Sequence, residues 1–586
     1  MCIIPLLLVS KGFFSQFTRF KIKITTQKGG AIINIFVFIL AYLIFNAVVL
    51  LFFKPILLQN PSYLVSSVPV FRFLAHNINL NFLILLFVIL TFFDSFVIFH
   101  YIYGRFKLFQ KKSSSNFKAP ILGLLVGKDL SGNKVYVPEK SLYQNFLITG
   151  SIGSGKTSSA MYPFTKQLIS YKADDFLKKI GFLILDVKGN FYSKVLEFAK
   201  ENNRLDDVIV IELNGKYKYN PLDKPELKSS IIANRLKTIL LLFSPNNTES
   251  YWLDKVEQIL ECAIDFCRIY NDNYVTFDEI HKLVTDFDYF SEKIKALRKD
   301  FVSGKLSKQD CYLLYHSITF LKKDYYSLDT RTFSILQSEI TRITNVFISD
   351  YDIHNTFCPT KSEENFYGFK DVIDNGKIVV LNMNIAEYKN LSKIIAAYLK
   401  LDFQTDVLKQ LSNSGNSIRT TAFISDEYQE YVTSSDANFF SQSREAKCIN
   451  IVSVQSYTSI INTLNNPNAS KVIIQNLVNK LWYRTDDVFT IEDIQKQIGK
   501  EEKKRVSKTI SENAKNSTYN PFFKNFSSSN SSLSESVNSY FQNDFVYDYN
   551  FFTQELKTFY SVAFLSTGDS VLKPQCLQMI PYFLKE

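Results

Sequence analysis

The eight residues from Gly150 to Thr157 constrain the fold of this chain more than any other stretch. They read GSIGSGKT, a G-x-x-x-x-G-K-T pattern that follows an apolar run at 145–149 and precedes a helical run. A loop with so little side-chain bulk lets several backbone N–H groups point at phosphate oxygens, and the helix behind it adds a favourable dipole. A flexible turn is the alternative. The full match after a buried strand favours a phosphate-binding loop.

Each position of this loop has an expected role. Lys156 can reach the β- and γ-phosphates of a nucleotide, and the hydroxyl of Thr157 can coordinate Mg²⁺. The remaining residues of the expected nucleotide site are Gly150, Ser151, Ile152, Gly153, Ser154 and Gly155. The pattern therefore predicts a site for a nucleoside triphosphate with magnesium.

Two adjacent acids supply what such a loop lacks. Asp426 ends the apolar run TTAFIS at 420–425, and Glu427 follows it directly. In this arrangement the aspartate supports Mg²⁺ and the glutamate polarises the attacking water, which predicts hydrolysis and not binding alone. An ordinary solvated acidic pair at a strand end is the alternative. Gln455 ends a further strand, where it either senses the γ-phosphate or is a plain polar strand end.

Short apolar runs alternate with helical patterns over much of the chain, which indicates an α/β fold with a mostly parallel sheet. The expected strands lie at 134–138, 145–150, 181–190, 207–213, 376–384, 420–425, 449–455 and 480–485. Between 225 and 365 the pattern is helical throughout. This stretch is therefore expected to be an all-α insertion domain.

The N-terminal part of the chain is expected to enter a membrane. Residues 31–53 contain no charge, and as a helix they would extend about 34 Å, enough to cross a hydrocarbon core. Residues 82–103 are a second candidate span, although Asp94 lies within them and its role is open. A buried core helix is the alternative for this second run.

The positive charge of the chain is concentrated at its N-terminal end. The net charge is +11, and residues 1–118 contain twelve Lys and Arg against the single acid Asp94, so the rest is about neutral. Basic residues flank the two candidate spans on their outer sides, which places both termini in the cytoplasm and the loop 54–81 outside. The charge of the remaining chain gives no independent support for nucleic-acid binding.

The expected domains follow from these patterns. Residues 1–118 form the membrane region, 119–224 and 366–586 form the nucleotide-binding domain, and 225–365 form the insertion. The Ser- and Asn-rich stretch 513–539 is expected to be a disordered loop. Seven Cys and five His are scattered without metal-ligand spacing, so a structural zinc site is not expected.

An ordered set of motifs makes nearly the whole chain similar to the TraG/TraD-type coupling proteins of type IV secretion and conjugation, which are RecA-like motor ATPases related to FtsK and HerA. The motifs, after two candidate spans, are GSIGSGKT (150–157), LDVKGNFY (185–192), YNPL (219–222), ESYWLDKVEQIL (249–260), SDEY (425–428) and SREAKCINIVSVQS (443–456). Three positions depart from the family pattern. Val187 replaces a usual proline, Asn190 replaces a usual acid, and Ser425 interrupts the apolar run before Asp426.

This resemblance implies a function and further site residues. The family uses ATP and Mg²⁺ to deliver single-stranded DNA with a bound relaxase, or protein effectors, to a secretion channel. It is located in the bacterial inner membrane and works as a homo-hexamer with ATP at subunit interfaces. Asp186 and Lys188 match family positions near the nucleotide. Arg444 matches an arginine that reaches a neighbour's γ-phosphate, although a plain surface arginine is the alternative.

Two other functions remain open. An FtsK/HerA-like DNA translocase would share the fold, but it usually carries more spans and a small C-terminal winged-helix domain. A membrane-tethered scaffold that binds nucleotide without turnover is the second. The presence of Lys156, Asp426 and Glu427 together argues against a scaffold.

Overall fold

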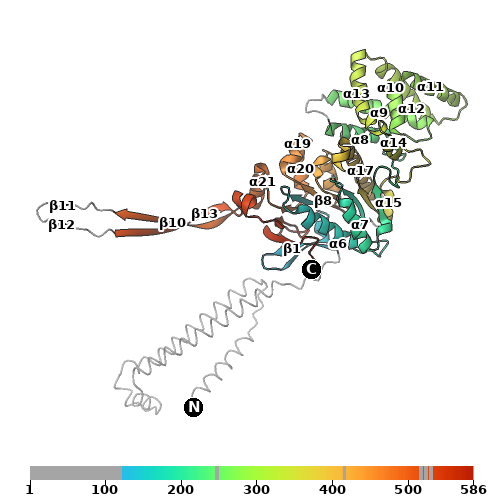
Figure 1. The fold of residues 1–586 in the computed structure, drawn as a ribbon. Coiled ribbons are helices and arrows are strands. Elements are labelled where there is room, and N and C mark those ends of the chain that lie inside the picture. Colours follow the sequence, from blue (N-terminus) through green and yellow to red (C-terminus); the bar gives the residue numbers. More distant parts are fainter. Residues whose placement is uncertain are drawn as a thin grey trace, which may run out of the picture. The chain divides into compact units, whose positions relative to one another are not determined.

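The computed structural model describes residues 122–186, 188–243, 250–412, 418–513, 519–520, 525–526 and 532–584 (Figure 1). All of them fall within one compact unit of the chain, Ala119–Glu586. No helix in this described part is both long and apolar enough to cross a membrane. The two expected spans, 31–53 and 82–103, lie outside the described residues.

A mixed, mostly parallel sheet of eleven strands is the centre of the described part. In spatial order its strands are β2 (Lys134–Pro138), β1 (Gly123–Asp129), β15 (Gln575–Met579), β14 (Tyr560–Phe564), β9 (Asn479–Trp482), β3 (Phe146–Thr149), β8 (Cys448–Val454), β7 (Thr421–Ser425), β4 (Gly181–Leu185), β6 (Ile378–Leu381) and β5 (Val208–Ile211). Neighbouring strands are parallel from β9 to β5 and antiparallel from β2 to β9. The α/β fold class expected from the sequence is confirmed.

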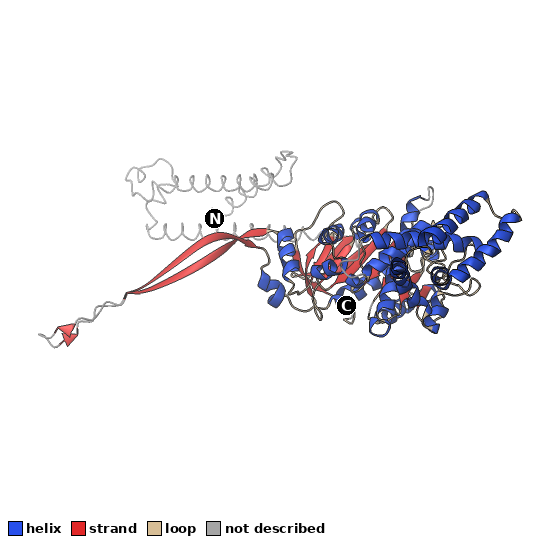
Figure 2. Cartoon of the chain, turned by 90° about the horizontal axis from the view of Figure 1, so that it is seen from above, coloured by secondary structure: helices blue, strands red, loops and turns tan. Residues whose placement is uncertain are grey.

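The parallel strands are apolar on both faces because helices cover both faces (Figure 2). In β3, Leu147 packs into one hydrophobic cluster, while Phe146 and Ile148 pack into the other. This alternation follows from the period of two in a strand. The helices outside the insertion are α5 (Glu139–Leu142), α6 (Tyr162–Ser170), α7 (Phe191–Glu201), α16 (Ile385–Tyr388), α17 (Asn390–Lys409), α18 (Asp436–Gln442), α19 (Tyr457–Leu464), α20 (Pro467–Asn476) and α21 (Val488–Ile498).

Between β5 and β6 the described residues form helices and no strand, in agreement with the helical pattern of the sequence. These helices are α8 (Ser229–Leu242), α9 (Ser250–Tyr270), α10 (Phe277–Thr285), α11 (Phe287–Val302), α12 (Lys308–Phe320), α13 (Thr330–Ile348), α14 (Tyr351–Phe357) and α15 (Lys370–Asn375). Several begin at a side chain that accepts a backbone N–H bond, as at Thr276, Asp286 and Asp329. Such caps satisfy N–H groups that a helix start leaves without partners.

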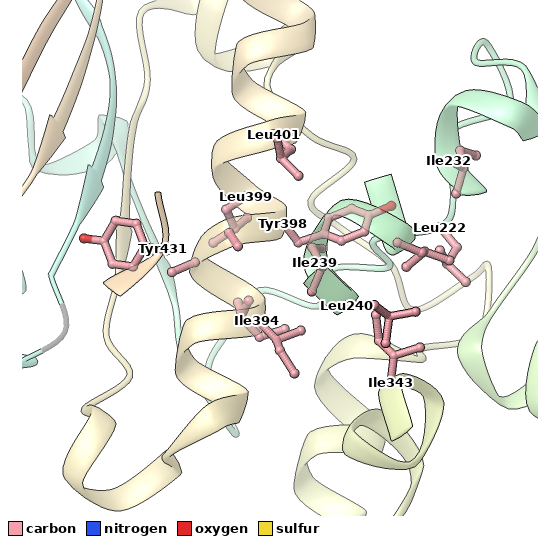
Figure 3. Close-up of a cluster of buried hydrophobic side chains, with 14 of the residues drawn as sticks. Leu222, Ile232, Ile239, Leu240, Ile343, Ile394, Tyr398, Leu399, Leu401 and Tyr431 are labelled. Carbon is pink, nitrogen blue, oxygen red and sulfur yellow. The ribbon is translucent and has the colours of Figure 1, made fainter. Parts of the chain in front are cut away.

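Helix α17 packs against both the helices of the insertion and the sheet. Its apolar residues belong to a hydrophobic cluster that also contains sheet residues and residues of α8, α9 and α13. Figure 3 shows Ile394 and Tyr398 of α17 beside Ile239 and Leu240 of α8. A fully buried Leu or Ile side chain contributes about 1.5–3 kcal/mol. The insertion therefore shares its hydrophobic core with the sheet.

A long hairpin replaces part of the disordered loop expected at 513–539. Strand β10 (Lys500–Asn513) pairs with β13 (Ser532–Phe545) in a separate antiparallel sheet, and β11 (Tyr519–Asn520) pairs with β12 (Asn525–Phe526). The prediction is therefore wrong for the strand residues in this range, 513, 519–520, 525–526 and 532–539. Composition alone could not reveal the long strand β13, because its backbone pairs with β10, which is distant in sequence.

Polar groups are buried where the segment after β5 meets the insertion. The N–H of Asn220 donates to Glu364 Oε1 at 3.1 Å, and the side chain of Asn220 donates to the carbonyl of Val275 at 2.8 Å. Burial raises the pKa of Glu364 to about 8, and the negative charge of Asp223 adds to this effect. Glu364 therefore keeps its proton to a higher pH in the folded chain than in the unfolded chain.

Glu364→Gln is expected to flatten the pH dependence of stability. Because the raised pKa of Glu364 favours the protonated folded state, the stabilisation is complete below about pH 4.5 and is lost as the pH rises toward 8. The loss is on the order of 3 kcal/mol in the wild type, and the neutral amide removes it. The free energy of unfolding in urea at about pH 5.5 and 8.5 measures the difference.

The matched control for this measurement is Glu363→Gln. Thr360 hydrogen bonds lower the pKa of Glu363 to about 2, so this neighbour does not titrate in the window. Its variant should keep the wild-type slope. A wild-type slope in Glu364→Gln would contradict the assignment.

Candidate functional site

The loop at 150–157 lies at the carboxyl end of β3, between two other parallel strands. Gly153 and Gly155 have φ angles of +77° and +96°, a region that residues with a Cβ rarely adopt. The N–H of Gly150 donates to the carbonyl of Val454 in β8, and that of Ser151 donates to Arg484 after β9. The helix behind the loop starts with a wide π-helical turn, η2 (Thr157–Met161), and continues as α6. The expected strand–loop–helix unit is therefore present.

Lys156 lies folded under this loop and is only 6% exposed. Its Nζ donates to the carbonyls of Gly150 at 2.5 Å and Ser151 at 3.3 Å. Burial lowers its pKa, while the nearby carboxylates of Glu427 and Asp426 act in the opposite direction. The lysine is thus held between the loop and the acidic pair.

Thr157 and Asp426, the two expected magnesium ligands, are in contact. The Oγ1 of Thr157 donates to Asp426 Oδ2 at 2.9 Å. Asp426 follows β7, and its own N–H donates to the carbonyl of Leu185 in β4, which fixes it at the sheet edge. Burial raises its pKa, and the charge of Asp186 adds to the effect. A hydroxyl and a carboxylate are hard oxygen donors, so the pair fits Mg²⁺ that also binds phosphate and water.

Glu427 is the point on which several polar side chains converge. Its carboxylate accepts hydrogen bonds from Lys188 Nζ at 2.7 Å, Gln429 Nε2 at 2.7 Å and Gln455 Nε2 at 3.1 Å. Burial alone would raise its pKa, but the bonds from Lys188 and Gln429 outweigh burial and lower it. The carboxylate is therefore ionised at neutral pH, as a general base must be.

The backbone of Glu427 is strained as well. Its φ of +50° is in the left-handed region, which is uncommon for a residue other than glycine. Such conformations cost about 1–3 kcal/mol and occur most often at functional sites. In this conformation the carboxylate accepts hydrogen bonds from Lys188 and Gln455.

Asp186 organises the neighbouring turn. Its two carboxylate oxygens accept the N–H groups of Lys188, Asn190 and Phe191 at 2.9–3.0 Å. These bonds cap the start of α7 and hold Lys188 so that its side chain reaches Glu427. The structure therefore brings Asp186 and Lys188 to the acidic side of the site, next to β7.

Arg444 is the one expected site residue that the described structure places apart from the others. It is exposed and precedes the amino end of β8. Because β8 runs parallel to β3, this end of β8 lies at the sheet edge opposite the phosphate loop. Arg444 cannot reach the nucleotide of its own subunit, and its role toward a neighbour stays a prediction.

Sequence reasoning did not identify two residues that contact this site. Gln429 donates to Glu427, and the only signal for it is its position two residues further along the chain. Phe559 lies beside Gly155, although slightly more than 400 positions separate the two in the sequence. No local pattern could have predicted that contact.

Residues 420–541 match the family model described as the TraM recognition site of TraD and TraG. The matched segment contains Asp426, Glu427, Arg444 and Gln455. The expected resemblance to TraG/TraD-type coupling proteins is confirmed. No curated protein matches the chain.

Solved structures with a similar fold include coupling proteins. The bacterial conjugative coupling protein TrwBdeltaN70 in its unbound monoclinic form is 11% identical, with a TM-score of 0.50 over 78% of this chain and 88% of that one. The plasmid coupling protein TrwB in complex with ADP and Mg²⁺ is 12% identical, with a TM-score of 0.43 over 64% and 78% of the two chains. VirB4 of Thermoanaerobacter pseudethanolicus is 14% identical, with a TM-score of 0.40 over 65% and 88%. At such identities the likeness to TrwBdeltaN70 shows a shared fold.

Proposed function

We propose that this chain is a coupling ATPase that uses ATP hydrolysis to deliver single-stranded DNA with a bound relaxase to a conjugation channel. One observation carries the proposal: Lys156, Thr157, Asp426 and Glu427 meet at one edge of the sheet. The match to the TraM recognition site of TraD and TraG covers both acids and connects this nucleotide site to DNA transfer. Protein effectors are the alternative cargo.

In the proposed mechanism each residue of the site has one role. The N–H groups of the loop and Lys156 bind the phosphates, and Thr157 and Asp426 would hold Mg²⁺, which when bound offsets phosphate charge. Glu427 accepts a proton from the attacking water, whose oxygen forms a bond to the γ-phosphorus as the bond to the β-phosphate oxygen breaks. Gln455 orients that water beside Glu427.

The proposed assembly is a homo-hexameric ring with nucleotide between subunits. The exposed position of Arg444, away from its own loop, is compatible with a contact to the next subunit. In such a contact the positive charge of Arg444 would stabilise the transition state of phosphoryl transfer, as an arginine finger does.

The proposed location is the bacterial inner membrane, with residues 31–53 and 82–103 as spans and the ATPase part in the cytoplasm. The uncharged run at 31–53 and the basic residues that flank the two spans support this arrangement. Channel components of the secretion system are the partners expected on the membrane side.

The test of the proposed function is conjugative DNA transfer in donor cells that lack this chain. Transfer should fall to background and return when the full chain is supplied, while plasmid maintenance stays unchanged. A defect in chromosome segregation with normal transfer would contradict the coupling function and favour an FtsK/HerA-like translocase. Purified full-length chain should hydrolyse ATP with Mg²⁺.

A further inference from the structure

Three aromatic residues from the last part of the chain pack together, and one of them, Phe559, lies against the phosphate loop. They are called here the aromatic cluster: Phe559, Tyr582 and Phe583. Phe559 directly precedes β14, and the other two follow β15. The rings of Phe559 and Phe583 are 6.0 Å apart between centroids, with planes at 72°, and those of Tyr582 and Phe583 are 5.5 Å apart at 80°. These edge-to-face contacts make the three rings one unit.

Backbone hydrogen bonds attach this cluster to the loop and to the helix behind it. The N–H of Phe559 donates to the carbonyl of Ser154 at 3.3 Å, and that of Tyr582 donates to the carbonyl of Ser158 at 2.9 Å. A third bond, from the N–H of Met579 to the carbonyl of Phe559 at 2.8 Å, holds the two parts of the cluster together. The cluster therefore has a defined position relative to any phosphate bound by the loop.

Phe559 has an unfavourable backbone conformation in this position. Its φ is +64°, in the left-handed region that is unusual for a bulky side chain. Its ring lies so close to the loop that a Cβ at Gly155 would be 2.6 Å from Phe559 Cδ1. Strain of this kind persists where the surroundings hold it, and it occurs most often at ligand sites.

The order of strands in the sheet indicates on which side of β3 each end of a bound nucleotide lies. Gln455, the acidic pair and Lys188 follow β8, β7 and β4, which lie on one side of β3. The γ-phosphate must lie on that side, because Glu427 and Gln455 act on it. The nucleoside end then points to the other side of β3, toward β9, β14 and β15, where the aromatic cluster lies.

The cluster presents an exposed aromatic side chain for contact with a planar group. Phe583 is 55% exposed although it packs against two other rings, and Phe559 is half-buried. Bases stack on aromatic side chains with little dependence on their identity, because every base has a π-face. A nucleobase next to the phosphate loop fits this surface in size and polarity.

We propose that Phe583, supported by Phe559, stacks on the nucleobase of the bound triphosphate. The site then selects nucleoside triphosphates over bare polyphosphate. This inference rests on the proposed function, since it uses the same phosphate loop. It adds a base-binding surface built from residues that lie about 400 positions after that loop.

Competition binding with the full-length chain tests this inference. A fluorescent non-hydrolysable ATP analogue is the probe, and unlabelled ATP and inorganic tripolyphosphate are the competitors. Phe583→Ala should weaken ATP binding about tenfold and leave tripolyphosphate binding unchanged, because only ATP carries a base. Phe583→Trp should restore ATP binding. The matched control is Phe301→Ala in α11, since Phe301 is 57% exposed and belongs to the insertion.

The outcomes separate the two proposals. If Phe583→Ala leaves both the ATP and the tripolyphosphate affinities at their wild-type values, the base-stacking inference fails and the ATPase proposal stands. Equal weakening of both competitors would also overturn the inference, because it would indicate damage to the loop. A wild-type chain that binds neither competitor overturns both proposals.

Discussion

Lys156→Ala is expected to abolish ATP turnover by the purified chain and to reduce DNA transfer to background. The Nζ of Lys156 is the cation of the phosphate loop, and it lies between the loop carbonyls and the two acids. Without it, the developing charge on the phosphate loses a charge-assisted hydrogen bond in a partly buried site. Loss of one such donor lowers turnover by at least about 10²-fold.

This loss is separable from misfolding. In the described structure the Nζ of Lys156 donates to the carbonyls of Gly150 and Ser151, and burial already disfavours its charge, so the variant should unfold near the wild-type midpoint. Lys166→Ala in α6 is the control, because the Nζ of Lys166 pairs with Glu201 on the surface and is not assigned any contact with the phosphates. Normal transfer by Lys156→Ala would refute ATP-driven coupling.

The parallel part of the fold could be predicted from the sequence because its strands are buried on both faces. Seven of the eight expected strand segments overlap the parallel strands β3 to β9, and the eighth overlaps the antiparallel strand β2. Continuous apolar runs such as GFLIL in β4 and IVVL in β6 are typical of a covered parallel sheet. The helical insertion was equally clear, because α9 combines periodic apolar residues with no helix breaker.

The antiparallel edge of the sheet and the hairpin were harder to predict from the sequence. Strand β1 (GLLVGKD) contains two glycines and two charged residues, so its pattern does not stand out. Its pairing with β15 joins segments more than 400 residues apart. Strand β13 is rich in polar residues and is stabilised by the ladder with β10. Such pairing depends on tertiary context that local propensity does not contain.

The site was predictable where chemistry is encoded by short motifs. The contact between Thr157 and Asp426 links a loop motif to a strand end, and the parallel topology brings them to one edge. The arrangement around Glu427 was only partly predictable. The functions of Asp186 as a capping acceptor and of Gln429 as a second donor depend on backbone geometry that residue spacing does not reveal.

Glu427→Gln is expected to retain nucleotide binding and to block hydrolysis. The amide has the shape of the carboxylate but cannot accept a proton from water, so turnover should fall by about 10²–10⁴-fold. Lys156, Thr157 and Asp426 remain in place to hold the phosphates and metal. Affinity for a non-hydrolysable ATP analogue and the rate of phosphate release under single turnover measure the two effects separately.

Structural damage from this variant should be small and can be checked. Lys188 donates to Oε1, and Gln429 and Gln455 both donate to Oε2. An amide nitrogen in the Oε1 position therefore loses the bond from Lys188 and keeps the other two. Glu430→Gln is the control three residues away, because Glu430 pairs with Lys393 and takes no part in the site. Normal turnover in Glu427→Gln would remove the general-base role. If Glu427→Gln binds nucleotide but neither hydrolyses it nor supports DNA transfer, the chain acts as a motor. A scaffold would need only bound nucleotide and would still support transfer.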